Sequence, residues 1–247
     1  MLFRSAREWE RRAARWTDLV LAVSTDERDE GIASGVLARY HIAPNGVVAR
    51  DWGKLTRSAA RNSLNLGTGP KAVCVGRLAR QKGQDRILEI WPAVRRSVAN
   101  AELYLVGDGP LRPELQRAAP TGVQFAGSSD EVDTWLCAAD IVILPSRWEA
   151  GGSLALFEAM AAQRSVVATR VAGIDEALHP GFGAILSQGD QAGLLAEVIH
   201  RLTSPAEADM EGRAARRWIE TNLDASSLAR HASDAYLTIA RIADRSS

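Results

Sequence analysis

Two carboxylates flank a short glycine-rich segment in the sequence IVILPSRWEAGGSLALFEAMAA, near the middle of the chain. Glu149 precedes Gly151, Gly152 and Ser153, and Glu158 follows them inside an apolar helical pattern. A glycine-rich loop that leads into a helix N-terminus can hold phosphate, because the loop approaches closely and the first helical N–H groups are partly positive. Carboxylates nearby can accept hydrogen bonds from sugar or ribose hydroxyls. The pattern therefore predicts a site for a polyhydroxylated ligand that carries phosphate.

A second polar segment, GRLARQKG, directly follows an apolar run and contains two cations between glycines. Arg77 supplies a planar fork of donors and Lys82 a mobile point charge, so together they can neutralise a diphosphate. Gly76 opens this loop, and Gly107 stands at the corresponding place after the next apolar run. The alternative for these cations is a solvated basic loop, which is the expected state of Arg80.

The glycines and Glu158 also have a purely structural interpretation. Glycine commonly marks the ends of strands and helices, and Glu158 could be an ordinary helical residue. Its neighbours Phe157 and Met160 argue against this, because an unpaired carboxylate in an apolar helix is costly. Glycines after several successive strands favour a ligand crevice, since the carboxyl ends of parallel strands meet at one edge of the sheet.

Other nucleotide and metal sites are not indicated. The sequence has no Gly-x-x-x-x-Gly-Lys-Ser/Thr motif, and the Gly-x-Gly at 107–109 lacks the third glycine of the dinucleotide fingerprint. The four histidines are dispersed without metal-ligand spacing, and no Asp-x-Asp pair occurs. We expect neither a resident cofactor nor a metal site.

Apolar runs of strand length alternate with helical patterns along most of the chain. The predicted strands cover residues 72–75, 102–106, 123–125, 140–144, 165–168 and 183–186. The predicted helices cover residues 84–97, 111–118, 130–138, 153–163 and 190–203. Several runs are continuously apolar, as expected when helices cover both faces of a sheet. The alternation predicts an α/β fold with a doubly wound parallel sheet, whose strand-to-helix loops share one edge.

The flanks of this region have different patterns. Two helical patterns and one strand pattern precede it, at residues 3–16, 25–37 and 19–23, respectively. The sequence HIAPNGV at 41–47 has turn chemistry, and the polar segment behind it resembles a linker or an irregular surface segment. After residue 203 the chain is expected to be helical to its end. The last helix would have an apolar face formed by Leu228, Ala232, Ala235, Ile239 and Ile242.

Composition is typical of a globular protein without a charge bias. The chain has 46% hydrophobic residues, and 30 Lys and Arg balance 30 Asp and Glu, so no bulk charge favours nucleic acid. Cys74 and Cys137 lie in apolar runs and are predicted to be buried thiols, which fits a reducing compartment. The first residues lack the apolar core of a signal peptide, and no apolar stretch is long enough for a membrane span. A cytoplasmic location is predicted.

The chain resembles the C-terminal, donor-binding domain of glycosyltransferase family 4, the retaining nucleotide-sugar enzymes of the GT-B fold. The matching segments are VGRLARQKG (75–83), LYLVGDGP (103–110), VQFAG (123–127), ADIVILPSRWEAGGSLALFEAMA (139–161) and VVATRVAGIDEAL (166–178). The resemblance implies a Rossmann-like half of a GT-B fold with flanking N- and C-terminal helices.

The resemblance also implies a division of the chain. Residues 1–40 would be the remnant of an N-terminal acceptor domain, and 41–70 the interdomain turn and linker. Residues 71–203 would form the nucleotide-sugar donor-binding domain, and 204–247 the C-terminal helices. The family's acceptor domain is much longer than this remnant. A truncated chain is therefore expected, or one completed by a partner chain that supplies the acceptor domain.

The family's site residues transfer to matching positions of this sequence. By resemblance, Arg77 and Lys82 hold the donor diphosphate, Glu149 contacts the transferred sugar, and Glu158 binds the nucleotide ribose. Catalytic roles are thus expected for Glu149, Arg77 and Lys82, and donor-binding roles for Glu158, Gly151, Gly152, Ser153, Gly76 and Gly107. The implied reaction is retaining, metal-independent transfer from a nucleotide-diphosphate sugar to a glycan or lipid-linked acceptor, in cell-surface polysaccharide or glycoconjugate biosynthesis.

Two features depart from the family pattern. Eight residues, 150–157, separate Glu149 from Glu158, one more than is usual, and Val48 stands where Asp often follows Asn-Gly-Val. A non-catalytic nucleotide-sugar-binding or partner-binding protein of the same fold remains an alternative, as does a sugar-nucleotide epimerase. A peripheral association with membranes also remains open.

Overall fold

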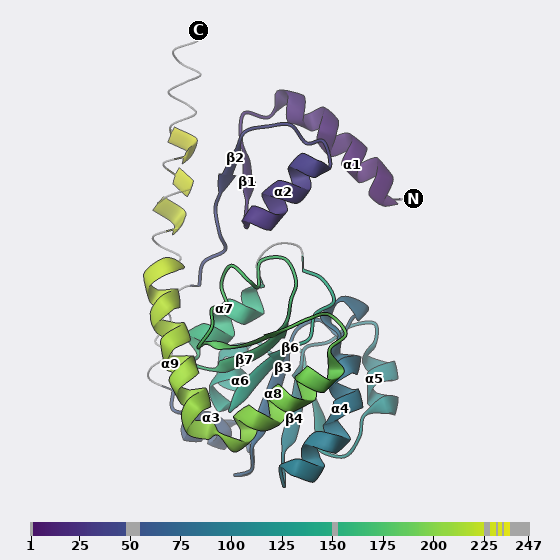
Figure 1. The fold of residues 1–247 in the computed structure, drawn as a ribbon, viewed down its shortest axis with the longest axis vertical. Coiled ribbons are helices and arrows are strands. Elements are labelled where there is room, and N and C mark those ends of the chain that lie inside the picture. Colours follow the sequence, from purple (N-terminus) through teal and green to yellow (C-terminus); the bar gives the residue numbers. More distant parts are fainter. Residues whose placement is uncertain are drawn as a thin grey trace.

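Six parallel strands form the main sheet, in the order β5-β4-β3-β6-β7-β8 (Figure 1). The computed structural model describes residues 2–47, 55–149, 153–224, 228–230, 232–233 and 235–237. The strands are β3 (Lys71–Val75), β4 (Glu102–Val106), β5 (Val123–Gly127), β6 (Ile141–Leu144), β7 (Ser165–Thr169) and β8 (Gly183–Leu186). The predicted α/β fold with a parallel sheet is confirmed.

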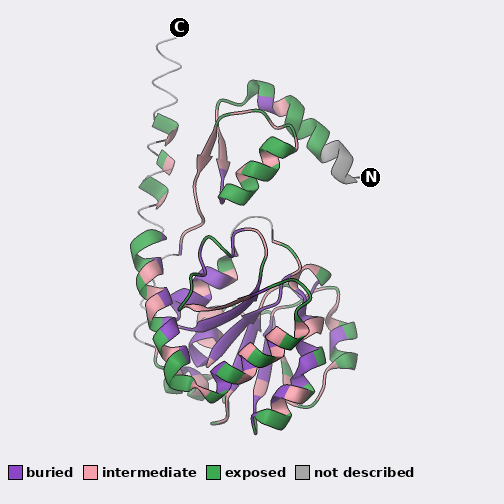
Figure 2. Ribbon diagram, in the orientation of Figure 1, coloured by how far each residue is buried: buried purple, intermediate pink, exposed green. Residues whose placement is uncertain are grey.

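The central strands are buried on both faces, because successive side chains of a strand point to opposite sides of the sheet. Val142 and Val166 belong to one hydrophobic core, whereas their neighbours Ile141 and Val167 belong to the other. Figure 2 shows these strands as buried and the outer faces of the surrounding helices as exposed. The continuous apolar runs of the sequence thus reflect two cores rather than one.

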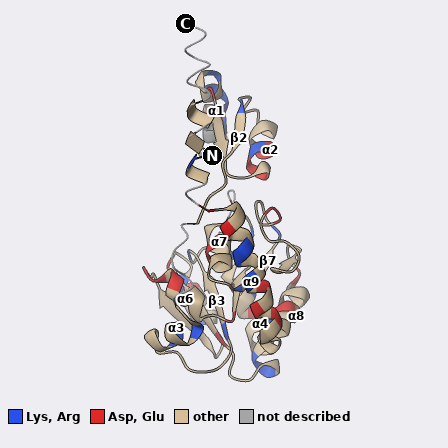
Figure 3. Cartoon of the chain, turned by 90° about the vertical axis from the view of Figure 1, so that its left-hand side faces the viewer, with Lys and Arg blue, Asp and Glu red and all other residues tan. Residues whose placement is uncertain are grey.

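Helices cover both faces of the sheet. One face carries α4 (Gln84–Ser97), α5 (Arg112–Ala118) and α8 (Gln191–Thr203). The other carries α3 (Arg57–Ser63), α6 (Val132–Ala138), α7 (Leu154–Ala161) and α9 (Pro205–Asn222). A buried ion pair between Arg201 and Glu211 joins α8 to α9, and the Ser165 hydroxyl also donates to Glu211. Basic and acidic residues are interspersed on the helices (Figure 3), in line with the balanced charge.

A smaller N-terminal unit, residues 2–43, lies over the loops that follow the carboxyl ends of the main strands (Figure 1). We call residues 55–224 the sheet unit. The N-terminal unit consists of α1 (Leu2–Ala13), the 3-10 helix η1 (Ala14–Trp16), β1 (Val20–Ala22), α2 (Thr25–Ala33) and β2 (Tyr40–Ile42). β1 and β2 form a two-stranded parallel sheet. The two predicted helices and the predicted strand of this region are present. α1 and η1 together cover the first predicted helix, whereas α2 and β1 are shorter than predicted.

β2 and α3 lie where the sequence predicted a turn and a linker or irregular segment. β2 has only three residues, too few for a periodicity, and is defined by pairing with β1. In α3, the Thr56 hydroxyl caps the helix by accepting from the Ala59 N–H. The guanidinium groups of Arg57 and Arg61 donate to the carbonyls of Ala139 and Ala138 at the end of α6. Tertiary contacts therefore make a helix of a polar segment without an apolar pattern.

The segment between the two units meets the end of α9. The Val47 N–H donates to the Leu223 carbonyl at 3.0 Å, so the segment between the two units is hydrogen-bonded to the residue that follows α9. Beyond α9, residues 228–230, 232–233 and 235–237 are helical, as expected. Leu228 packs against the core, whereas Leu237 is 54% exposed. Positions 239 and 242 of the predicted apolar face lie outside the described residues.

Candidate functional site

Lys82 and Glu149 meet at the carboxyl edge of the main sheet. Lys82 follows β3 and Glu149 follows the neighbouring strand β6. The Lys82 Nζ lies 2.7 and 2.8 Å from the two Glu149 carboxylate oxygens. The Ser146 hydroxyl donates to the same carboxylate at 2.7 Å, and the Gln81 amide donates at 3.3 Å. The Glu149 side chain is 7% exposed and that of Lys82 is 22% exposed, so the pair is mostly shielded from water.

The loop that carries Lys82 is shaped by glycines and a buried leucine. Gly83 has φ +67°, and a Cβ at this position would lie 2.2 Å from the Pro145 carbonyl oxygen. The Leu78 side chain of this loop is fully buried. The Gln84 amide donates to the Arg77 carbonyl at 3.0 Å. The loop therefore holds Lys82 against the segment after β6 by backbone packing that any larger residue at position 83 would disturb.

Gly76 and Gly107 bring the ends of β3 and β4 into backbone contact. Gly107 has φ +134°, and a Cβ there would lie 2.2 Å from the Gly76 carbonyl oxygen. The Gly76 N–H donates to the Val106 carbonyl, and the Gly107 N–H donates to the Gly127 carbonyl. Close backbone packing accounts for Gly107, and a positive φ of +147° accounts for Gly76. Their donor-binding role stays a prediction.

Arg77 differs from Lys82 in its surroundings. It is exposed, and its guanidinium forms no ion pair with the residues that the structure describes. Arg80 is exposed as well, as predicted. Two cations of one loop thus have different states, since Lys82 has a buried carboxylate partner and Arg77 remains available to a ligand.

Sequence reasoning missed a second bridge between the same two loops. The Arg147 guanidinium donates to both carboxylate oxygens of Asp85 and to the Arg80 carbonyl. The hydrogen bond from Arg147 is the main cause that lowers the pKa of Asp85 below its ordinary value. These residues are 62 positions apart, so no local sequence pattern predicts the pair. It braces the loop that carries Lys82 against the loop that carries Glu149.

The remaining predicted residues lie on or before α7. Ser153 is the N-cap residue of α7 and is 5% exposed, but its side chain forms no capping hydrogen bond. Glu158 is half-buried inside the helix and has an interaction partner. Gly151 and Gly152 lie outside the described residues. The structure therefore brings Lys82 and Glu149 into contact, while the predicted ligand roles of the α7 residues stay predictions.

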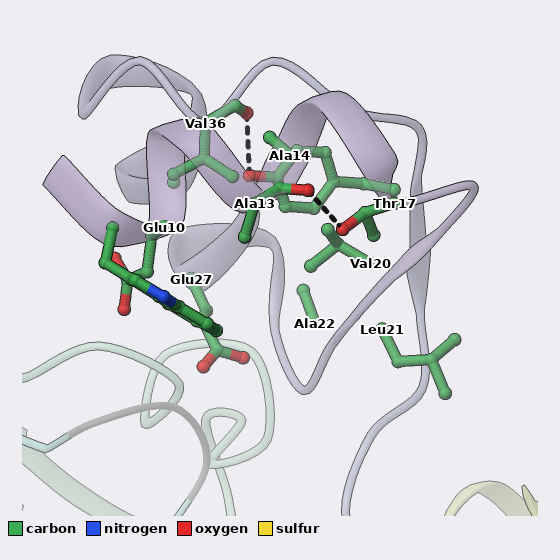
Figure 4. A pocket seen from close by; sticks show the side chains of 12 residues that line it. Glu10, Ala13, Ala14, Thr17, Val20, Leu21, Ala22, Glu27 and Val36 are labelled. Carbon is green, nitrogen blue, oxygen red and sulfur yellow. Dashed lines mark hydrogen bonds between the residues drawn. The ribbon is translucent and has the colours of Figure 1, made fainter. Parts of the chain in front are cut away.

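An apolar cavity of about 300 Å³ lies within the N-terminal unit (Figure 4). Ala14, Val20 and Ala22 line it together with the aromatic residues Trp9 and Tyr40. The residues that line it belong to α1, η1, β1, α2 and β2 and to the segments between these elements. The cavity is thus a feature of this unit and not of the site at the sheet edge.

Among the residues that the structure describes, no group of three or more His, Cys, Asp or Glu side chains could hold a metal ion. Within the same ranges, every helix is too short or too polar to cross a membrane.

Residues 69–204 match the family described as "Glycosyl transferases group 1". This match covers more than half of the chain, and the chain therefore belongs to that family. It is 29% identical over 231 residues to a GDP-mannose-dependent alpha-(1-6)-phosphatidylinositol monomannoside mannosyltransferase of Mycobacterium tuberculosis, covering 87% of this chain and 60% of that protein. It is 31% identical over 229 residues to a glycogen synthase of the same organism, covering 89% and 53%. The chain thus spans between half and two thirds of the length of these relatives.

Solved structures share the fold. The sucrose-phosphate synthase from Thermosynechococcus elongatus superposes with a TM-score of 0.83 at 23% identity, covering 97% of this chain and 62% of that chain. Anabaena Alr3699/HepE in complex with UDP and glucose gives a TM-score of 0.82 at 19% identity, covering 92% and 65%. Together with the parallel sheet, these likenesses confirm the expected Rossmann-like half of a GT-B fold.

Proposed function

We propose that the sheet unit binds a nucleotide-diphosphate sugar and that the protein is a retaining glycosyltransferase. The observation that carries the proposal is the Lys82–Glu149 pair at the carboxyl edge of a parallel sheet, in a chain of the group 1 glycosyltransferase family. Open α/β sheets bind ligands at this edge. The name of one relative specifies GDP-mannose as its donor, and one structure of the same fold holds UDP and glucose.

In this proposal, the diphosphate replaces Glu149 as the partner of Lys82. A phosphate oxygen can take the same short, charge-assisted hydrogen bonds from the ammonium that the carboxylate takes in the structure described here. The released Glu149 then faces the sugar, where it can accept hydrogen bonds from hydroxyl groups. Arg77 adds a second cation, so the negative charge that grows on the departing diphosphate is stabilised more than that of the bound donor.

The proposed acceptor is a glycan or a lipid-linked sugar of cell-surface polysaccharide or glycoconjugate biosynthesis, and the proposed location is the cytoplasm. The N-terminal unit would form part of the acceptor side, because it lies over the candidate donor site (Figure 1). Its two-stranded sheet and its apolar cavity are consistent with further chain, or a partner chain, that completes the acceptor side. Peripheral contact with a membrane would follow from a lipid-linked acceptor.

Calorimetry with UDP, GDP, UDP-glucose and GDP-mannose tests donor binding. We expect at least one of these ligands to bind, and Lys82→Ala to weaken its binding by at least about tenfold, since a charge-assisted hydrogen bond is lost. Arg117→Ala is the matched control, because it removes an exposed cation whose guanidinium donates to the Pro113 carbonyl within α5. Absence of binding by all four ligands, or an equal loss in both variants, would contradict the proposal.

A binding protein without turnover is the alternative function. The small N-terminal unit favours it, because three-residue strands leave little acceptor surface on this chain. Incubation with the ligand that binds distinguishes the two functions. Release of free sugar or formation of a glycoside by the purified chain supports the enzyme, whereas unchanged ligand after binding supports the alternative.

A further inference from the structure

A carboxylate of the sheet unit caps a helix of the N-terminal unit. Glu176 lies in the loop after β7, and its Oε1 accepts hydrogen bonds from the Thr25 N–H at 3.1 Å and from the Thr25 hydroxyl at 2.6 Å. The same oxygen accepts from the Asp26 N–H at 3.3 Å. These residues are separated by about 150 positions in the sequence. The contact therefore joins the two units.

The N–H groups of the first three residues of α2 have partners, supplied by this contact and by a local cap. A helix leaves its first N–H groups without intrahelical partners. The Glu27 N–H finds one in the Ser24 hydroxyl at 3.1 Å, and the N–H groups of Thr25 and Asp26 find theirs in Glu176. A carboxylate at this end of a helix also interacts favourably with the helix dipole.

A return contact runs in the opposite direction. The Asp26 carboxylate accepts a hydrogen bond from the Gly173 N–H at 3.1 Å. Gly173 has φ +78°, a conformation that glycine adopts without strain, and it belongs to the same loop as Glu176. Within the described residues, the hydrogen bonds that join residues 2–43 to the sheet unit are those of Thr25 and Asp26 with this loop.

The loop after β7 also rests on the segment that carries Glu149. The Thr169 hydroxyl donates to the Ser146 carbonyl at 2.5 Å, and the Gln188 amide donates to the carbonyls of Ser146 and Arg170. Ser146 in turn donates its hydroxyl to Glu149. The contact to α2 therefore starts from a loop that is fixed relative to the candidate donor site.

We propose that Glu176, Thr25, Asp26 and Gly173 form a latch that sets the orientation of the N-terminal unit over the sheet edge. Glu176 is a positioning residue, since it touches the helix and not the candidate ligand site. The segment that contains Val47 links residues 2–43 to the sheet unit covalently, and the latch adds hydrogen bonds from a second place, the loop after β7. The latch is independent of which ligand the sheet unit binds.

Hydrogen exchange measured by NMR tests the latch in the intact chain. We expect the amides of Thr25, Asp26 and Gly173 to be protected in the native protein. In Glu176→Ala, the amides of Thr25 and Asp26 should exchange at least about tenfold faster. Amides of the buried strands, such as Val142 and Val166, should keep their protection, which separates loss of the latch from loss of the fold. Exchange of Thr25 and Asp26 at the rate of free amides in the native protein would overturn the proposal without any variant.

A distance measurement tests the orientation itself. Spin labels at Leu37→Cys and Met210→Cys report on the two units, because both positions are exposed and Cys74 and Cys137 are buried. Glu176→Ala should broaden the distribution of distances between the labels, and Glu176→Gln, which keeps one acceptor oxygen, should restore most of it. Asp175→Asn is the matched control, since this neighbouring carboxylate pairs with Arg170 at the surface. Identical distributions in the native protein and Glu176→Ala, or equal broadening by Asp175→Asn, would overturn the latch.

Discussion

The two units of this protein hold their shapes in different ways. In the sheet unit, β6 and β7 are buried along their whole length, and two hydrophobic cores cover the faces of the sheet. In the N-terminal unit, every residue of β2 is only half-buried, and Trp9 and Trp16 are 71% and 82% exposed. Burial of apolar surface is the main stabilising contribution to a fold, so the two units differ in what supports them.

This difference bears on the site. Lys82 and Glu149 stand on loops that start from buried strands, so their contact is a product of the sheet unit's own packing. Among the described residues, the hydrogen bonds that join the N-terminal unit to the sheet unit instead come from one loop. Chemistry that needs only donor binding therefore belongs to the well-packed unit, whereas chemistry that needs both units also depends on their relative orientation.

Paired leucine truncations should produce the largest difference between the units. Leu105 is fully buried in β4, and Leu105→Ala should lower the free energy of unfolding by about 2–5 kcal/mol. Leu37 is 77% exposed in the N-terminal unit, and Leu37→Ala should change the free energy by less than about 0.5 kcal/mol. Urea unfolding followed by circular dichroism measures both. Similar losses of unfolding free energy in the two variants would mean that Leu37 is covered in solution.

Glu149→Gln tests the role of the Lys82–Glu149 ion pair in ligand binding by the sheet unit. The substitution removes the negative charge that competes with phosphate for Lys82, so UDP or GDP should bind about tenfold more tightly. The matching nucleotide sugar should gain less, because the proposed contact of Glu149 with the sugar is weakened. Calorimetry compares the two ligands, with Glu114→Gln on the exposed side of α5 as the charge control. Weaker binding of the nucleoside diphosphate would argue against an exchange of partners at Lys82.

Acid should lower the free energy of unfolding through the Arg147–Asp85 pair, which is a smaller effect than the two above. The pKa of Asp85 is lowered in the folded protein, so its stabilising contribution is present above the ordinary value of 3.8 and is lost as the pH falls through the folded value. Because the side chain is 41% exposed, this contribution should be under about 1 kcal/mol. Urea unfolding between pH 7 and pH 3 should show a smaller loss for Asp85→Asn than for the native chain. An identical pH dependence would exclude the pair as a source of stability.

Thiol labelling should show no reaction of the native protein, which is the smallest of the expected effects. Burial raises the pKa of the Cys74 thiol to about 12, and burial is also the main cause that raises the pKa of Cys137. Neither should react with a thiol reagent at pH 8 while the chain is folded. Leu37→Cys on the N-terminal unit should react at once under the same conditions. Rapid labelling of the native chain would mean that the sheet unit opens locally.

Much of the sheet unit could be predicted from the sequence, because its signals are local. The apolar runs at β3, β6 and β7 predicted the strands, and the glycines in the sequence after them predicted a ligand crevice at one edge. The rule that strand-to-helix loops of a parallel sheet share one edge placed Lys82 and Glu149 at that edge. The helix α3 could not be predicted in this way, since its arginines bond to carbonyl groups about 80 positions away.

By itself, the sequence determined the order of strands and helices along the chain, the parallel sheet that they form and the cations and acids that follow its strands. Periodicity and loop chemistry carry that information over short distances. Only the tertiary structure decided that Glu149 is the partner of Lys82, that Arg147 is bound to Asp85 and that Glu176 caps α2. These pairs join residues 62 to 151 positions apart, and a charged side chain gives no local sign of its partner. Packing of the two cores brings together the pairs within the sheet unit, and the position of the N-terminal unit over the loop after β7 brings Glu176 to α2. For that reason the structure was needed to find these pairs.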